Sequence, residues 1–105
     1  MKTRNTVVLS RIKNLVREID PTSDVILYGS RARGEEHPES DWDLLILVNT
    51  QTDLDYERVF RHRLYEIELE LGEAFSVSVY NKKEWKLNHW MTPLYQNIAK
   101  EGLRI

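Results

Sequence analysis

Apolar residues near the start of the chain recur at the spacing of a helix. Steps of four, three and four positions separate the members of one stripe, which consists of Val8, Ile12, Leu15 and Ile19. Side chains at this spacing share one face of a helix, and the polar residues between them face outward. Asp20-Pro21 follows, and the residue before a proline is steered away from helical backbone angles. The pattern predicts an amphipathic helix over about residues 5–19.

Two continuous apolar runs come next, with a polar stretch between them. Residues 25–28 are closed by Gly29, and this run predicts a strand that is buried on both faces. Residues 44–48 form the longer run, and we expect residues 42–48 to be the central strand of a sheet. The polar stretch from Ser30 to Ser40 predicts a loop, which can open with a short helix over residues 30–33.

A second helix is expected in the middle of the chain. Either Asp53 or Asp55 can cap its start, and Gly72 after Leu71 is a typical stop. Its buried stripe is expected to consist of Phe60, Leu64, Ile67 and Leu71. The helical spacing of this stripe predicts that these four side chains share the buried face of the helix.

The last part of the chain predicts a strand and a helix. Residues 75–80 alternate aromatic residues or valine with serine, which is the period of a half-buried strand. Lys82-Lys83 are expected in a solvated turn, and Thr92-Pro93 is typical of a helix start, with Gly102 at its end. The whole order predicts an α/β (α+β) fold, in which helices flank a small mixed β-sheet.

Composition narrows the class of protein. Of 105 residues, 41% are hydrophobic, which suffices for one core, and we expect a single domain over residues 1–105. Lys and Arg number 15 against 17 Asp and Glu, and the net charge of -2 argues against a protein that coats nucleic acid. The chain has no cysteine and no apolar run long enough for a membrane span. We therefore expect a protein of the cytoplasm that does not enter a membrane.

Two aspartates at the start of the central strand are candidate metal ligands. Side chains alternate across a strand, so Asp41 and Asp43 are expected on the same side. Two neighbouring carboxylates repel each other, and a cation would relieve that repulsion. Mg²⁺ commonly takes one or two carboxylates and completes its shell with water and substrate phosphate. Asp53-Leu54-Asp55 has the same spacing but precedes a helix, where capping is the simpler explanation.

A candidate phosphate-binding segment follows the preceding strand. Gly29 lacks a Cβ and would let a phosphate approach the backbone, and Ser30 adds a hydroxyl donor. Arg31 and Arg33 supply local positive charge. For each arginine, contact with phosphate and internal pairing with Glu35, Glu36 or Asp41 are equally open alternatives. The segment predicts a triphosphate-binding bend that faces the carboxylate pair.

These two segments resemble the signature of a known enzyme superfamily. Residues 29–34, Gly-Ser-Arg-Ala-Arg-Gly, followed by residues 40–44, Ser-Asp-Trp-Asp-Leu, are similar to the nucleotidyltransferase superfamily that includes DNA polymerase beta, and most closely to its minimal nucleotidyltransferase (MNT) domains. The resemblance implies transfer of a nucleotidyl group, AMP, from an NTP, ATP being favoured, to a hydroxyl acceptor, with two Mg²⁺ ions. It assigns Gly29 and Ser30 to the triphosphate, and Asp41 and Asp43 to the metals and catalysis.

The chain departs from the pattern of that family at one position. Active members carry a third carboxylate on a later strand, whereas residues 75–80 contain no acid, and Ser76 or Ser78 is expected in its place. Glu73 is the acid nearest to this strand in the sequence. The departure leaves an alternative function open, a nucleotide-binding or antitoxin-like module without turnover. MNT proteins neutralise a helical HEPN-type toxin, so the resemblance also implies a HEPN-type partner.

Overall fold

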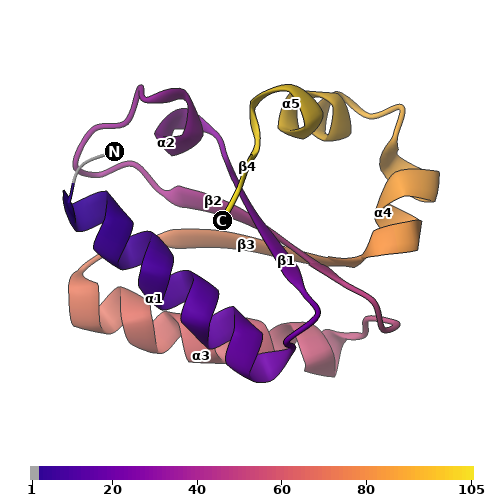
Figure 1. Ribbon diagram of the computed structural model, residues 1–105, viewed down its shortest axis with the longest axis horizontal. Coiled ribbons are helices and arrows are strands. Elements are labelled where there is room, and N and C mark those ends of the chain that lie inside the picture. Colours follow the sequence, from indigo (N-terminus) through magenta and orange to yellow (C-terminus); the bar gives the residue numbers. More distant parts are fainter. Residues whose placement is uncertain (1–2) are drawn as a thin grey trace.

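The computed structural model of the chain describes residues 3–105, and Met1 and Lys2 of the expected domain lie outside the described residues. Figure 1 shows the elements, which follow one another as α1 (Thr3–Ile19), β1 (Asp24–Tyr28), α2 (Ser30–Arg33), β2 (Trp42–Val48), α3 (Leu54–Leu71), β3 (Phe75–Asn81), α4 (Lys82–His89), α5 (Pro93–Glu101) and β4 (Leu103–Arg104). The expected α/β fold, a small mixed sheet flanked by helices, is confirmed.

The sheet brings three strand ends to one edge. Its strand order is β3-β2-β1-β4, with β1 antiparallel to β2 and β4 and with β2 parallel to β3. The strand over residues 42–48 therefore lies inside the sheet, as expected. The register sets Asp43 opposite Tyr28 on one side and Ser76 on the other. The end of β1 and the starts of β2 and β3 thus meet at the edge that carries the candidate site.

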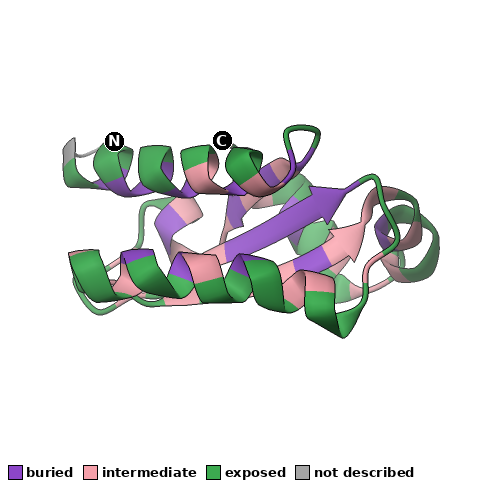
Figure 2. Cartoon of the chain, turned by 90° about the horizontal axis from the view of Figure 1, so that it is seen from below, coloured by how far each residue is buried: buried purple, intermediate pink, exposed green. Residues whose placement is uncertain are grey.

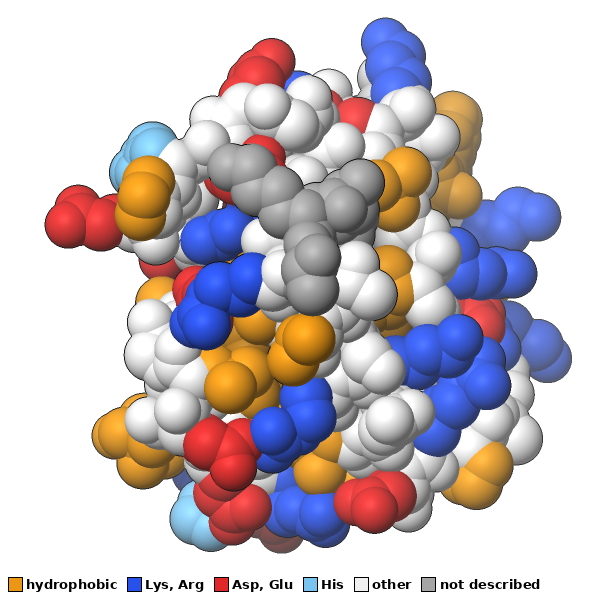
Figure 3. Space-filling model, turned by 60° about the vertical axis from the view of Figure 1, so that its left-hand side comes forward, with side chains coloured by type: hydrophobic (Ala, Val, Ile, Leu, Met, Phe, Trp, Pro, Cys, Tyr) orange, Lys and Arg blue, Asp and Glu red, His pale blue; other side chains and the backbone are white. Residues whose placement is uncertain are grey.

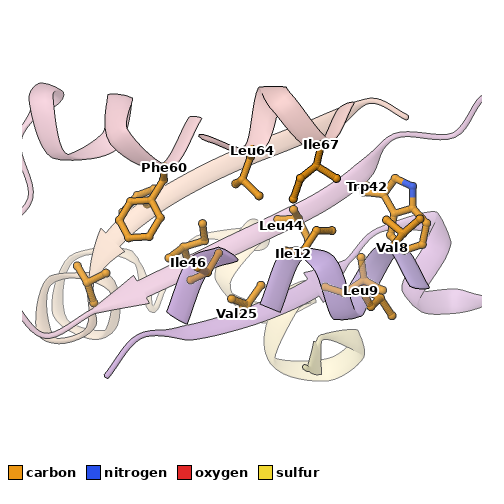
Figure 4. Packing of buried hydrophobic residues seen from close by; sticks show 14 residues of the cluster. Val8, Leu9, Ile12, Val25, Trp42, Leu44, Ile46, Phe60, Leu64 and Ile67 are labelled. Carbon is orange, nitrogen blue, oxygen red and sulfur yellow. The ribbon is translucent and has the colours of Figure 1, made fainter. Parts of the chain in front are cut away.

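One face of the sheet packs against α1 and α3. Figure 4 shows side chains of both helices pointing toward those of β2, and Figure 2 shows that the outer sides of these helices are exposed. The fully buried side chains of this core include Val8, Ile12, Val16, Leu27, Trp42, Leu44, Ile46, Val48, Phe60 and Leu64. Both expected helical stripes contribute to this core. Burial of each such side chain is worth about 1.5–3 kcal/mol, so this face carries most of the stability.

The opposite face of the sheet is only partly covered, and here two expectations fail. Leu45 and Leu47 pack there with Trp85 of α4 and Ile98 of α5. The expectation that residues 25–28 are buried on both faces is wrong, because burial alternates along β1, and its outward side chains on this face stay half-buried. Lys82-Lys83 begin α4 rather than a solvated turn, since the Asn81 side chain caps the helix by accepting from the backbone N–H groups of Lys83 and Glu84.

Capping residues explain where the expected helices begin and end. Asp53, rather than Asp55, caps α3: its carboxylate accepts a hydrogen bond from the backbone N–H of Tyr56 at 2.8 Å. Gly72 ends the same helix in the left-handed conformation. Thr92 caps α5 by accepting from the backbone N–H of Tyr95 at 3.1 Å. An N-terminal cap of this kind stabilises a helix by about 1 kcal/mol.

Asp20 joins the end of α1 to α3. Its carboxylate accepts hydrogen bonds from the Thr22 hydroxyl at 2.7 Å, the Thr22 backbone N–H at 3.0 Å and the Tyr56 hydroxyl at 3.0 Å. Burial acts to raise the pKa of Asp20, but these hydrogen bonds outweigh it and lower that pKa below its usual value. The ionised carboxylate therefore stabilises the folded chain.

We expect Asp20→Asn to lower the free energy of unfolding at pH 7 by about 1–2 kcal/mol, because an amide makes weaker hydrogen bonds than a carboxylate. Because the pKa of Asp20 is lower in the folded chain than in the unfolded chain, ionised Asp20 contributes its full stability at pH values above its unfolded-state pKa. This contribution is lost as the pH falls through the folded-state pKa of Asp20. Urea unfolding should show the difference between the two proteins shrinking in that acidic range. The exposed Asp55→Asn is the matched control; a pH-independent difference would contradict this account.

Among residues 3–105, no helix is long and apolar enough to cross a bilayer. Figure 3 shows Lys and Arg side chains interleaved with Asp and Glu over one face of the molecule. Two ion pairs, Arg11–Glu70 and Arg63–Glu18, join α1 to α3.

Candidate functional site

The carboxylate of Asp43 lies directly against the backbone of Gly29. Tyr28 and Asp43 are partners in the antiparallel register, and Gly29 follows with a φ angle of 77°, in the left-handed region. A Cβ atom added to Gly29 would lie only 2.1 Å from Oδ2 of Asp43. Both the backbone angle and the neighbouring carboxylate therefore require glycine here. The bend and the acid that the sequence analysis paired are close neighbours in the structure.

Asp41 and Asp43 form a negatively charged pair at the start of β2. Removal from solvent raises the pKa of Asp43, the charge of Asp41 raises it further, and Arg33 opposes both effects. Asp43 is half-buried and Asp41 is exposed. Loss of solvent and a neighbouring like charge both disfavour the ionised form of Asp43. Arg33 therefore does not fully offset the negative charge of the pair.

The donor set fits a hard divalent cation that shares its ligands with a substrate. Within residues 3–105, no group of three His, Cys, Asp or Glu side chains is placed to hold a metal ion. Two carboxylates at an open edge, Asp41 and Asp43, leave most of a coordination shell for water and phosphate oxygens, which is how Mg²⁺ is usually bound. A closed structural metal site does not fit this arrangement.

Gly29 and Arg33 already hold an anionic group, the carboxylate of Glu101. Its Oε1 accepts hydrogen bonds from the Gly29 backbone N–H at 3.4 Å and from Arg33 Nη1 at 3.1 Å, and its Oε2 accepts from Arg33 Nη1 at 3.2 Å. Glu35 accepts a further hydrogen bond from Arg33 Nε at 3.0 Å. These hydrogen bonds raise the pKa of Arg33. The bend thus binds an anion through one backbone and one side-chain donor.

Glu101 is a residue that the sequence analysis missed. It lies at the C-terminal end of α5, and Figure 1 shows α5 and β4 beside α2 on one side of the sheet. No local pattern connects Glu101 to residues about seventy positions earlier in the chain. Only the return of α5 and β4 along β1 brings it to Gly29.

Arg31 points away from this site, into the structure. It is 7% exposed and donates from Nε and Nη2 to the Ser40 carbonyl at 3.0 and 2.8 Å. Its guanidinium lies 4.2 Å from the ring centroid of Trp42, and Nη2 lies 3.6 Å from Glu73. Arg31 is therefore paired internally, as one of the two alternatives predicted, but its carboxylate partner Glu73 was not among those expected.

Glu73 belongs to that same cluster on the face of α1 and α3. Its carboxylate accepts from Trp42 Nε1 at 3.1 Å and pairs with Arg4 at 3.1 Å. Trp42 and Asp43 are successive strand residues and face opposite sides of the sheet. Glu73 is therefore engaged on the face opposite to Asp43.

The β3 strand offers hydroxyl groups beside Asp43. Ser76 is the parallel partner of Asp43, and Ser78 is the partner of Leu45 two residues further on. Ser78 is hydrogen-bonded to the Tyr28 hydroxyl, whose pKa is raised by burial and then by Asp43. Ser76 thus stands where a strand acid would face the pair.

Ser30 takes its expected place at the start of α2. It is half-buried, and its carbonyl accepts from the backbone N–H of Glu35 at 2.9 Å. Gly29 precedes it as the helix cap, and its carbonyl accepts from the N–H groups of Ala32 and Arg33, both at 3.1 Å. These bonds fix the short turn that carries Ser30 and Arg33 beside Gly29.

Known proteins with similar folds include complexes of toxins and antitoxins. A toxin–antitoxin structure with AMP-PNP has a TM-score of 0.66 and 21% identity, over 90% of this chain and 69% of that chain. An MntA–HpeT toxin–antitoxin variant has a TM-score of 0.65 and 19% identity, over 90% and 69% of the two chains. A tri-AMPylated Shewanella oneidensis HEPN toxin in complex with MNT antitoxin has a TM-score of 0.62 and 17% identity, over 94% and 69%. At these identities the likeness establishes a common fold.

The family is established by sequence. No significant match is found among curated proteins. The sequence model of the nucleotidyltransferase domain matches residues 9–105, which include the bend, the carboxylate pair and all three strands that meet at the site. The chain therefore belongs to the nucleotidyltransferase domain family.

Proposed function

We propose that the chain binds Mg²⁺·ATP at this site and transfers AMP to a hydroxyl group of a HEPN-type protein partner. The observation that carries the proposal is the contact between Asp43 and Gly29, where an added Cβ would lie 2.1 Å from Oδ2. It sets a candidate metal ligand beside a backbone that already binds an anion. We assign this activity to the cytoplasm, where ATP is made available and a cysteine-free chain needs no oxidising compartment.

Each group at the site has a part in this proposal. Asp41 and Asp43 would hold two Mg²⁺ ions, which, when bound, offset the charge of the triphosphate and stabilise the attacking and leaving oxygens. The Gly29 N–H, the Ser30 hydroxyl and the Arg33 guanidinium would bind the phosphates, with Arg33 supplying the charge-assisted contact. Arg31 would act indirectly, by holding the Ser40 carbonyl just before Asp41.

The partner and the nucleotide are suggested by the structural relatives. The solved complexes that share the fold contain toxins, and one includes AMP-PNP. Another contains a tri-AMPylated HEPN toxin, which supports AMP as the transferred group and a HEPN-type chain as the acceptor.

Transfer can be tested with ATP labelled at the α-phosphate, Mg²⁺ and a co-purified HEPN-type partner. We expect label to appear on the partner with the unchanged chain and to disappear with Asp41→Asn/Asp43→Asn. Asp55→Asn, which changes an exposed Asp of the second Asp-x-Asp pair, should leave labelling intact. Equal labelling by the unchanged and the doubly substituted chain would reject the proposal.

A second candidate, binding of nucleotide and partner without turnover, is favoured by one observation. The strand position opposite Asp43 is Ser76, whose hydroxyl is a weak metal ligand and a poor base. Calorimetry combined with an assay for pyrophosphate separates the two functions. ATP binding without pyrophosphate release in the presence of the partner would select the second candidate. We expect Ser76→Asp to increase release if the first is correct.

The bound position of Glu101 leads to a further prediction. Because its carboxylate occupies the Gly29 N–H and Arg33, a phosphate group must displace it. We expect Glu101→Gln to tighten ATP binding on the order of fivefold, since a partly exposed ion pair is worth at most about 1 kcal/mol. Glu35→Gln is the matched control, because Glu35 also pairs with Arg33 but makes no contact with Gly29. Weaker ATP binding by Glu101→Gln would contradict competition at this bend.

A further inference from the structure

The outer edge of β3 has none of the features that usually keep an edge strand from pairing. Within residues 3–105, β3 pairs with β2 on one side and with no strand on the other. Its seven residues, 75–81, include no charged residue and no proline, and their register with β2 runs without a bulge. Charged residues, prolines, bulges and very short strands are the usual protection of a sheet edge. The β3 edge is therefore able to pair with a strand of another chain.

Apolar surface lies beside this edge. A cavity of about 560 Å³ lies between α3 and β3, where Phe75 and Val77 of the strand line it together with Tyr65 of the helix. Tyr65 and Leu69 are one helical turn apart and are 53% and 68% exposed. A partner that pairs with β3 would also cover these side chains, and the removal of their apolar surface from water favours association.

The charged side chains along the same groove form two halves of opposite sign. Arg58 and Arg61 line it before Tyr65, and Glu68 lines it after Tyr65. Their steps of three and four positions place them on one face of α3. Both arginines are exposed and pair with acidic residues of their own helix at 3.6 and 3.7 Å, contacts that contribute little in water. Burial and then the charge of Asp41 raise the pKa of Glu68, so a cation beside it would be favourable.

A two-fold axis beside Tyr65 would make this pattern complementary to itself. Arg61 lies four positions before Tyr65 and Glu68 three positions after it, so two antiparallel copies of α3 set Arg61 of each opposite Glu68 of the other. Because β2 and β3 are parallel, the connecting helix α3 runs opposite to β3. Tyr65 is six positions, about 9 Å, before the end of α3, and Ser78 is three positions, about 10 Å, after the start of β3. One axis can thus pass both the helix and the middle of the strand.

We propose that two copies of the chain form a dimer by antiparallel pairing of β3 with β3 and by packing of α3 against α3. The two sheets then become one continuous sheet. The other sheet edge is β4, which has two residues, so each copy offers one long edge and association ends at two copies. Trp42 and Phe75 pack with α1 and α3, whereas Asp43 faces the opposite side of the sheet. The contact between the helices therefore leaves the candidate metal ligands uncovered, and the dimer goes beyond the proposed function without depending on it.

Charge reversal tests the proposed axis. Sedimentation equilibrium of the unchanged chain should show a dimer. Arg61→Glu alone and Glu68→Arg alone should each raise its dissociation constant at least about tenfold, because like charges then meet across the axis. An equimolar mixture of the two variants should dimerise again, since both contacts of the mixed dimer join opposite charges. An unchanged chain that is monomeric up to about 1 mM, or folded variants whose mixture remains as dissociated as either alone, would overturn the proposal.

A second set of substitutions makes the test independent of those two side chains. Tyr65→Asp should be tolerated by the fold because the side chain is half exposed, and it sets two like charges at the axis, so we expect a monomer. Leu87→Asp, at a 72% exposed position of α4, is the matched control and should remain a dimer. The chain has no cysteine, so mild oxidation of Tyr65→Cys should link two copies, whereas Leu87→Cys should not. A Tyr65→Asp dimer, or linkage through Leu87→Cys instead, would place the interface elsewhere and overturn the proposal.

Discussion

Gly29→Ala is expected to abolish ATP binding and to destabilise the fold. The new Cβ would lie 2.1 Å from Oδ2 of Asp43, so the carboxylate or the bend must move. The φ angle of 77° adds backbone strain of about 1–3 kcal/mol, and the steric overlap adds about 1–3 kcal/mol more. We expect ATP affinity to fall at least about 100-fold, because displacement by an ångström disrupts a positioned site.

Gly34→Ala provides the matched control for this substitution. Its φ angle of 75° is also positive, but its ψ of 20° is the αL conformation, which costs alanine less than the ψ of −160° at Gly29, and no atom lies within 4 Å of an added Cβ. We expect it to lose only about 1–3 kcal/mol of stability and to retain ATP binding. Comparison of the two variants by thermal unfolding and calorimetry tests whether ATP binding depends on the bend at Gly29 and its contact with Asp43, and not on a positive φ angle alone. Equal ATP binding by both variants would show that the contact between Gly29 and Asp43 is unimportant for the site.

Asp43→Asn should change activity and stability in opposite directions. Transfer is expected to fall at least about 100-fold. Replacing a residue that only hydrogen-bonds to a metal ligand already lowers metal affinity or activity about 10–100-fold. Without divalent metal, the free energy of unfolding should rise on the order of 0.5 kcal/mol, since the substitution removes the repulsion from Asp41. Transfer assays and urea unfolding in EDTA measure the two effects.

The opposite signs distinguish a functional charge from a structural one. If Asp43 mainly supported the fold, its amide variant would lose stability in EDTA and would lose activity only in proportion. Asp55→Asn again serves as the control: transfer should be unaltered because the side chain is 91% exposed, and stability should fall slightly because Asp55 lies in the first turn of α3 and pairs with Arg58. A less stable Asp43→Asn in EDTA would contradict the assignment of the pair to metal.

The parts of the fold that could be predicted were those with dense local signals. The stripe from Val8 to Ile19, and the glycine after Leu71, each needed only neighbouring residues to be interpreted. The helix α4 escaped prediction because its eight residues are largely polar and its cap, Asn81, lies at the end of a strand. The strand β4 has two residues and exists only through pairing with β1, which no local pattern encodes.

The candidate site also contains residues that local spacing predicts and residues that only tertiary packing brings to it. Gly29 and Asp43 are fourteen positions apart, and their approach follows from two apolar strands joined by one loop. Arg31 and Arg33 have identical chemistry two residues apart, and only packing decides that one contacts the Trp42 ring while the other faces Glu101. Glu101 itself arrives from the far end of the chain. Local spacing could predict the acids and the bend, but not the groups brought by tertiary packing.

The central claim is that Asp41 and Asp43 hold a metal–nucleotide complex against the bend at Gly29. Its most direct test is a calorimetric titration of ATP into the unchanged chain and into Asp41→Asn/Asp43→Asn, with Mg²⁺ and with EDTA. We expect saturable binding by the unchanged chain that depends on Mg²⁺, and a double variant whose weaker binding is the same in both solutions. Binding by the double variant that still responds to Mg²⁺ as the unchanged chain does would contradict the claim.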